Sequence, residues 1–392
     1  MKKKVCMIIY TTYFFDSRVR REAETLVALL DYHLTVITLK RDKVPNNYKL
    51  DGVNILEVNQ SIYSGTSKIK YIFSYLEFFL RSFISCTKLY LRNETDIVHV
   101  HNMPNFLVFA AIIPRIFGKK LILDIHDSVP ETFSSKYKSK SSLFFRLLCF
   151  EEYISCKIAN KLICVNVPQQ EILVRRGIPA KKFTILMNVP DPQKIDLSKI
   201  KNRSARNKNG TFRMVYHGTI AERLGIDLII QSINSIKEEL QNFEFHIFGR
   251  SGGEAQKLKK LSSKLGLSDK IIFRNIITLD QIPEELQHMD AGIIGNRKDS
   301  ATELMLPVKL LEYNTLEIPV IAPNLKAIKY YFSNEMVCFY EAENIDSMAN
   351  AILIFYKDKT KREKFAQNAK EFSRCYEWNK HKYDLINLYK NI

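Results

Sequence analysis

Residues 302–324, TELMLPVKLLEYNTLEIPVIAPN, decide the fold of this chain. Pro307 suits the first position of a helix, where its missing N–H is no loss, and residues 308–316 carry apolar side chains at helical spacing. The apolar run 319–323 follows after a short turn, and its length and composition indicate a strand buried in an α/β layer. The stretch therefore predicts a helix that starts near Pro307 and leads into a buried strand.

Two charged residues share one face of this expected helix. Lys309 falls in the first turn, where the helix dipole disfavours a cation by about 0.3–1 kcal/mol. Glu312 follows three residues later, so one interpretation is a weak i,i+3 surface ion pair. The other interpretation is an anion bound at the helix start, which would remove the conflict between Lys309 and the dipole. Spacing alone leaves both open.

Length and composition indicate two ordinary α/β domains in a reducing compartment. The chain has 392 residues, of which 46% are hydrophobic, enough for two cores. Its seven cysteines are scattered, with no CxxC pair and no secretory signal before them, so we expect reduced thiols in a cytosolic protein. The longest apolar stretch, 69–91, contains charged residues and so is not expected to span a bilayer, although it could lie on one.

Positive charge is concentrated in the first half of the chain. Residues 1–190 contain 28 Lys and Arg against 16 Asp and Glu, a balance of +12, whereas 191–392 contain 31 against 26, a balance of +5. Such an imbalance favours a polyanion, for which anionic lipid headgroups are one candidate, and simple solubility is the alternative. Nucleic acid is not expected as a partner, because no recognised binding module and no aromatic-interleaved basic strand appears.

The first half alternates strand and helix patterns, as a doubly wound parallel sheet does. A helix over 17–30 follows the first strand, with Asp16 as its N-cap. The loop between them contains no glycine, which argues against a dinucleotide cofactor here. Strands are expected at 5–10, 34–39, 53–58, 97–101, 121–125 and 161–166, with helical patterns near 69–91, 106–117 and 144–159.

Polar clusters follow two of these strands, where ligands of parallel sheets collect. They lie at 99–102 and 124–127, and each contains histidine. Four His and Asp positions could suggest a metal, but we expect alternate strand residues to face opposite sides, and no ligand spacing such as HExxH appears. We therefore expect no metal.

The second half begins after a polar stretch, 193–211. Apolar residues do not recur in it at the spacing of a helix or a strand, which is typical of a linker. A strand at 212–216 ends in His217-Gly218-Thr219, and a helix follows at 226–240. A second strand, 244–248, leads into the glycine-rich loop 249–254 and a helix at 255–265, which suggests either a phosphate-sized concavity or only a tight turn. Further strand and helix patterns at 270–274, 278–286 and 290–295 complete a second α/β set.

The motif Pro-x-Lys-x-x-Glu-Tyr at 307–313, followed by Pro-Val-Ile-Ala, resembles the donor-site helix of the family 4 retaining glycosyltransferases of the GT-B fold. The resemblance covers nearly the whole chain, best at 120–190 and 212–323. It implies two Rossmann-like doubly wound parallel-sheet domains facing across a cleft. The implied parts are an acceptor-binding domain at 1–192, the linker at 193–211, a nucleotide-sugar-binding domain at 212–375 and a C-terminal helix at 376–392 that crosses back to the first domain.

The resemblance also implies roles for single residues. Glu312 would hold the ribose of a nucleotide sugar, Lys309 would face its diphosphate, and His126 would contact the donor sugar near the reacting carbon. The expected catalytic residues are therefore His126, Arg223, Lys309 and Glu312. The expected donor-binding residues are Gly218, Thr219, Gly249, Arg250, Glu303, Leu304, Pro307 and Asn188, and the expected acceptor-side residues are Asp16, Arg18, Asp127 and Glu131.

Structural roles are the alternative for several of these residues. His126 could be a hydrogen-bonded histidine at a strand end, Arg18 a solvated helix arginine and Asn188 a turn former. The chain also departs from the family pattern at two places. Arg223 stands one position before the usual lysine, and Leu304 stands where many members have a glutamate.

The resemblance implies a retaining, metal-independent transferase without a cofactor. It would move a sugar from a UDP- or GDP-linked donor to a glycan or lipid-linked acceptor, in bacterial surface polysaccharide synthesis. We expect a cytoplasmic protein that lies on the inner face of the cell membrane through the basic, aromatic-rich region 68–92. Two alternatives stay open, a nucleotide-sugar 2-epimerase of the same fold and a non-catalytic binding or scaffold subunit.

Overall fold

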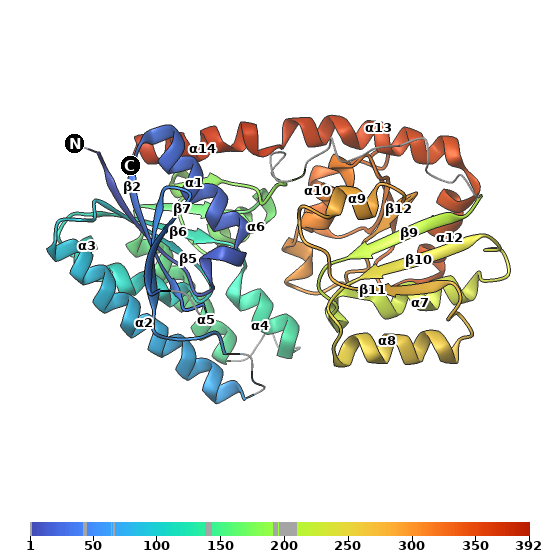
Figure 1. The fold of residues 1–392 in the computed structure, drawn as a ribbon, viewed down its shortest axis with the longest axis horizontal. Coiled ribbons are helices and arrows are strands. Elements are labelled where there is room, and N and C mark those ends of the chain that lie inside the picture. The colour runs from blue at the N-terminus through green and yellow to red at the C-terminus, as the bar shows by residue number, and fades with distance from the viewer. Residues whose placement is uncertain are drawn as a thin grey trace. The chain divides into compact units, whose positions relative to one another are not determined.

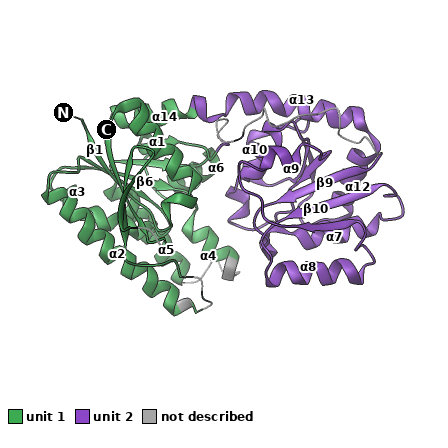
Figure 2. Cartoon of the chain, in the orientation of Figure 1, with its two compact units in different colours: residues 1–188, 381–392 green, residues 189–380 purple. Residues whose placement is uncertain are grey.

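The computed structural model describes residues 2–41, 45–63, 65, 67–137, 143–190, 195 and 210–392. The chain divides into two compact units, unit 1 with residues 1–188 and 381–392, and unit 2 with residues 189–380 (Figure 2). The end of the chain thus belongs with its beginning. The linker expected at 193–211 lies outside the described residues except at 195, 210 and 211.

Unit 1 is built on an eight-stranded sheet in the order β3-β4-β2-β1-β5-β6-β7-β8. Its strands pair in parallel except β3, which forms an antiparallel hairpin with β4. The hairpin turn is Asp51-Gly52, and both residues have positive φ, as two-residue hairpin turns require. The strands are β1 (Lys4–Ile8), β2 (His33–Leu39), β3 (Asn47–Leu50), β4 (Val53–Val58), β5 (Ile97–His101), β6 (Lys120–Ile125), β7 (Lys161–Cys164) and β8 (Phe183–Ile185).

Helices cover both faces of this sheet (Figure 1). The expected N-cap is confirmed, because Asp16 Oδ1 accepts a hydrogen bond from the Val19 N–H at 3.0 Å. The single helix expected near 106–117 is instead a 3-10 helix (Asn105–Ala111) followed by a short α-helix, since Pro114 has no N–H to donate to the carbonyl four residues earlier. The helices are α1 (Ser17–Leu30), α2 (Lys68–Leu91), α3 (Ile112–Ile116), α4 (Val129–Tyr137), α5 (Leu143–Ile158), α6 (Val167–Arg175) and α14 (Trp378–Lys390).

Unit 2 contains a six-stranded parallel sheet in the order β11-β10-β9-β12-β13-β14. Its strands are β9 (Phe212–His217), β10 (Phe243–Phe248), β11 (Ile271–Arg274), β12 (Ala291–Ile293), β13 (Val320–Pro323) and β14 (Val337–Tyr340). Its helices are α7 (Ile226–Ser235), α8 (Gly253–Lys264), α9 (Ile282–Leu286), α10 (Val308–Thr315), α11 (Lys326–Tyr331), α12 (Ile345–Lys357) and α13 (Lys359–Cys375). The expected strand and helix alternation is present in both units.

The helix expected near Pro307 is α10, which begins one residue later. Pro307 has φ of −65° but ψ of 123°, so it is the extended N-cap residue and the helix starts at Val308. The carboxyl ends of β9 and β10 and the start of α10 lie at the edge of the sheet where parallel α/β folds bind ligands.

Candidate functional site

His217 ends β9, and α10 places Glu312 against it. His217 Nε2 lies 2.7 Å from Glu312 Oε2, and His217 Nδ1 lies 3.0 Å from the Tyr313 hydroxyl. Both His217 and Glu312 are buried. The alternative ion pair between Lys309 and Glu312 does not form among the described residues, because the carboxylate is held by His217. His217 was not an expected site residue, and its place directly after a buried strand was the signal for it.

Lys309 lies with its ammonium over an aromatic ring rather than beside a carboxylate. Its Nζ is 3.7 Å from the centroid of the Tyr216 ring. Burial lowers the pKa of Lys309 to about 7, and the nearby Glu312 charge opposes this only in part. The Nζ is also 3.6 Å from where a Cβ on Gly218 would lie, and Gly218 has φ of +108°. A glycine turn and a cation without an ion pair in the described structure form a place suited to an anion.

Arg223 follows in the short 3-10 helix Glu222–Leu224 and is exposed. Burial raises the pKa of Tyr216, and the charge of Arg223 lowers it, so Arg223 lies near the same tyrosine as Lys309. The Tyr216 hydroxyl donates to the Thr219 carbonyl oxygen at 2.5 Å, which ties the loop to the strand. The structure therefore brings together Lys309, Arg223, Gly218 and Thr219.

Gly249 belongs to the same edge. The Gly218 N–H donates to the Phe248 carbonyl oxygen at 2.9 Å, and a Cβ on Gly249 would lie 2.9 Å from the Gly218 carbonyl oxygen. The two turns therefore pack backbone against backbone, and Gly249 has no room for a side chain. Arg250 comes next and is exposed.

Glu303 and Leu304, two of the expected donor-binding residues, have surroundings different from those of Lys309 and Glu312. Glu303 Oε2 accepts a hydrogen bond from the Lys326 N–H at 2.7 Å, so its carboxylate caps the start of α11. Leu304 is buried. The other carboxylate oxygen of Glu303, Oε1, lies 3.8 Å from Lys298 Nζ.

Asp124, at the end of β6, is the centre of a second cluster in unit 1. Arg18 from α1 donates to its carboxylate through Nε at 3.1 Å and Nη2 at 3.0 Å, and His126 Nε2 lies 2.9 Å from its Oδ2. Burial acts to raise the pKa of Asp124, but Arg18 and His126 hold it well below its usual value. In return, Asp124 raises the pKa of His126 against the effect of burial. Asp124 was not among the expected site residues, although it stands in the predicted polar cluster.

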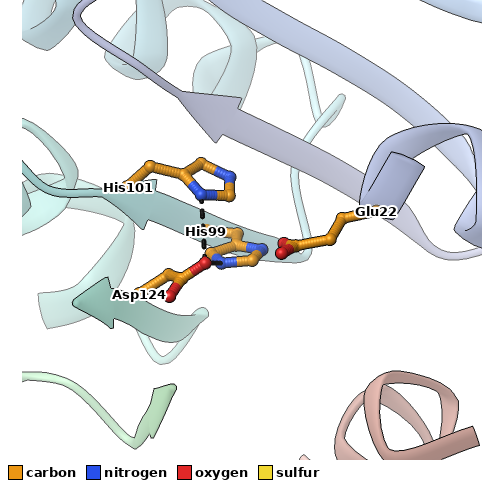
Figure 3. A group of neighbouring side chains, drawn as sticks. All are labelled: Glu22, His99, His101 and Asp124. Atoms are coloured by element: carbon orange, nitrogen blue, oxygen red, sulfur yellow. Dashed lines mark ion pairs between the residues drawn. The ribbon is translucent and has the colours of Figure 1, made fainter. Parts of the chain in front are cut away.

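Four side chains around Asp124 could hold a metal by ligand type. Glu22, His99, His101 and Asp124 each place one ligand atom within 4.8 Å of the others (Figure 3). The expectation that these strand residues face opposite sides is wrong for His99 and His101, which are two positions apart and have ring centroids 4.2 Å apart. However, Arg18 Nε lies 3.1 Å from Glu22 Oε1, and the same guanidinium donates to Asp124. Burial raises the pKa of Glu22 to about 7. The guanidinium thus already supplies the charge that a cation would bring.

Each half of the chain matches a family model. Residues 17–194 match the model described as Glycosyltransferase Family 4, and residues 198–372 match the model described as Glycosyl transferases group 1. The chain therefore consists of a Family 4 glycosyltransferase domain followed by a group 1 glycosyltransferase domain, and it has the GT-B fold. None of the curated proteins matches the chain in sequence.

Solved structures share the fold of this glycosyltransferase. Sucrose-phosphate synthase (tll1590) from Thermosynechococcus elongatus is 16% identical with a TM-score of 0.79, over 100% of this chain and 99% of that one. HepE of Anabaena, in complex with UDP and glucose, is 15% identical with a TM-score of 0.71, over 100% of both chains. WaaG, a glycosyltransferase involved in lipopolysaccharide biosynthesis, is 17% identical with a TM-score of 0.69, over 94% of this chain and 95% of that one.

The expected acceptor-side residues of the glycosyltransferase fall into two groups. Arg18 and Glu131 lie in buried ion pairs, with Asp124 and Arg176 respectively, so their charges are compensated inside unit 1. Asp16 caps α1, whereas Asp127 lines an open pocket of unit 1 together with His126. Asn188, an expected donor-binding residue, accepts a hydrogen bond at Oδ1 from Arg21 Nη2 at 3.3 Å.

Proposed function

We propose that this glycosyltransferase is a retaining, metal-independent enzyme. It moves a sugar from a UDP- or GDP-linked donor, bound by unit 2, to a glycan or lipid-linked acceptor, bound by unit 1. The observation that supports it most is the pairing of Glu312 with His217 beside Lys309, at the glycine turns that end β9 and β10. The UDP and glucose bound in the HepE structure, a protein of the same fold, support a nucleotide-sugar donor.

Each residue has a distinct part in the proposed reaction. The leaving diphosphate gains negative charge as its bond to the sugar breaks, and Lys309, Arg223 and backbone N–H groups of the glycine turns would stabilise that charge. Glu312 would fix the ribose through Oε1, because His217 already holds its Oε2. Fixing the ribose would place the anomeric carbon for attack. His126 would contact the donor sugar near that carbon.

We expect Glu312→Gln to weaken nucleotide binding about ten- to a hundredfold. A hydrogen bond to a charged group contributes about 1.5–3 kcal/mol, and an amide has only one acceptor oxygen, so it cannot accept from both His217 and the ribose. Calorimetric titration of UDP, GDP and their sugar conjugates measures the effect. Glu341→Gln, at an exposed carboxylate of unit 2, is the matched control and should leave affinity unchanged.

The outcome of this titration separates the proposal from its alternatives. Micromolar binding of one nucleotide, lost in Glu312→Gln, supports the donor site and identifies the sugar conjugates to assay, and NMR of the product's anomeric proton then tests retention. No binding of any nucleotide to the unaltered protein would overturn the proposal and favour a non-catalytic subunit. Consumption of donor without any acceptor would favour the 2-epimerase.

We also propose that unit 1 lies on the inner face of the cell membrane, as part of surface polysaccharide synthesis. No helix in the described part of the chain is long and apolar enough to cross a bilayer. On α2, however, an apolar stripe at helical spacing is exposed, consisting of Ile69, Ile72, Phe73, Leu76, Leu80 and Ile84. Lys70, Arg81 and Lys88 stand on the same helix. An exposed apolar stripe on a basic helix is typical of binding to an anionic lipid surface.

Replacing Ile72, Phe73 and Leu76 together by serine is expected to reduce vesicle binding at least about tenfold. These side chains are 58%, 65% and 43% exposed, and burying even part of their area in lipid would contribute more than about 1.4 kcal/mol. Co-sedimentation with vesicles that contain phosphatidylserine measures the bound fraction. Leu29, Ile276 and Leu279, exposed apolar side chains outside the stripe, provide the matched triple variant. Equal binding by both triple variants would contradict the membrane proposal.

A further inference from the structure

The open pocket of unit 1 has a wall made of tyrosines. It has a volume of about 220 Å³ and is lined by Tyr10, Tyr63, Tyr71 and Tyr75. The ring centroids of Tyr10 and Tyr75 are 4.4 Å apart, and those of Tyr71 and Tyr75 are 4.8 Å apart at 83°. Tyr75 donates its hydroxyl hydrogen bond to the Tyr71 oxygen at 3.0 Å. The rings therefore hold one another in place and present both apolar faces and hydroxyl groups.

Besides the tyrosines, Ile62 and Met103, the pocket is lined by three polar residues. His126 and Asp127, which follow β6, line it together with Asn102, which follows β5. Asn102 Nδ2 donates to the Asp127 carbonyl oxygen at 2.7 Å and Oδ1 accepts from the His126 N–H at 2.7 Å, so the two loops are tied together. The Asp127 carboxylate itself makes no hydrogen bond among the described residues and is exposed.

The charge of this pocket contrasts with the rest of the first half. Residues 1–190 carry a balance of +12, yet among the residues that the structure describes no Lys or Arg side chain lines the pocket. His126 is paired with Asp124, which leaves the Asp127 carboxylate as the unpaired charge that a ligand would meet. A phosphate or a carboxylate would be repelled here, whereas sugar hydroxyls could donate to Asp127.

The size of the pocket limits its occupant. Pockets for drug-sized ligands have volumes of about 300–1,000 Å³, so a space of about 220 Å³ suits a single ring. We propose that this tyrosine pocket binds one neutral sugar ring, the terminal residue of the acceptor, and selects it against acidic sugars. The proposal rests on the transferase function proposed above. Tyr71 and Tyr75 belong to α2, which also carries the exposed apolar stripe, so the pocket and the proposed membrane-binding surface share one helix.

The test uses methyl glycosides of neutral hexoses and N-acetylhexosamines, each paired with the methyl glycoside of the matching hexuronic acid. Saturation-transfer NMR on the full chain measures their affinities. We expect at least one neutral glycoside to bind at least about fivefold more tightly than the glycoside of the matching uronic acid. In Asp127→Asn, the ratio of these two affinities should be smaller. Tyr75→Ala should weaken binding of the neutral glycoside at least about tenfold, Tyr75→Phe should keep most of it, and Tyr330→Ala, at an exposed tyrosine of unit 2, should change nothing.

Several results would overturn the pocket assignment. These are tighter binding of the acidic glycosides, unchanged binding in Tyr75→Ala, or no binding of any neutral glycoside. Calorimetry with UDP and GDP on the same protein distinguishes the two proposals, because the nucleotide site is expected in unit 2. If the unaltered protein binds a nucleotide but no glycoside, only the assignment of the tyrosine pocket is overturned. If the unaltered protein binds no nucleotide, the proposed function is overturned. Circular dichroism of Tyr75→Ala checks that unit 1 is folded.

Discussion

Lys309→Met is expected to lower kcat/KM about 10²- to 10³-fold and to remove the pH dependence of donor binding. The size of the effect follows from the loss of one preorganised group that stabilises charge on the leaving diphosphate. The pH dependence follows from the pKa of Lys309, which burial lowers to about 7 in the free protein. Methionine is unbranched and nearly as long as lysine but carries no charge.

Donor binding is expected to weaken as the pH rises above 7. A bound diphosphate favours the ammonium form, so the pKa of Lys309 is higher in the complex than in the free protein. Below pH 7 the ammonium is already present, and binding takes up no proton. Above pH 7 binding takes up to one proton, and affinity falls by up to about tenfold per pH unit until the pKa of the complex is reached.

Calorimetry of a sugar nucleotide at pH 8, in buffers of different ionisation enthalpy, counts the protons taken up. Lys260→Met, at an exposed lysine of α8, is the matched control and should behave like the unaltered protein. Donor turnover in EDTA should equal turnover without it, because Lys309 and Arg223 are proposed to do what a divalent ion does in other transferases. Equal proton uptake by Lys309→Met and the unaltered protein would refute the assignment of Lys309 to the diphosphate.

Asp124→Asn is expected to destabilise unit 1 by about 3–5 kcal/mol. The carboxylate compensates the buried Arg18, and removing one partner of a buried ion pair leaves the other charge uncompensated. The same change should lower the pKa of His126, because burial acts to lower it and Asp124 is the carboxylate that raises it. The effect on stability should exceed that of any surface ion pair of the chain.

Urea unfolding followed by circular dichroism measures the stability, and NMR titration of the His126 ring measures its pKa. Asp31→Asn is the control, because the Lys2–Asp31 pair is largely exposed and should contribute less than about 1 kcal/mol. The triple variant Arg18→Met/Glu22→Gln/Asp124→Leu should recover much of the loss, since Glu22 also lies 3.1 Å from Arg18 and the three buried charges are removed together. A loss below about 1 kcal/mol in Asp124→Asn would show that Arg18 finds another partner.

Features that depend on residues close together in the chain could be predicted from the sequence. The strand at 97–101 was predicted from the pattern of apolar residues, and the helix after Asp16 from its N-cap. Both signals involve residues only a few positions apart. The helix near Pro307 was predicted for the same reason, and its Lys309 and Glu312 were already visible as an unusual pair of charges. The hairpin of β3 was missed although Asp51-Gly52 is a typical turn, because Asn47–Leu50 is short and polar.

Contacts between charged groups and rings that are far apart in the chain depend on the tertiary structure. His217 and Glu312 are 95 residues apart, and Arg18 and Asp124 are 106 apart, so their pairing depends on which strand ends and helices the sheet brings together. Whether Lys309 pairs with Glu312 was open from spacing and was decided by the competing bond from β9. The tyrosine pocket likewise draws on α2 and on the segments after β1, β4, β5 and β6. Its charge and size come from side chains that no local pattern in the sequence places together.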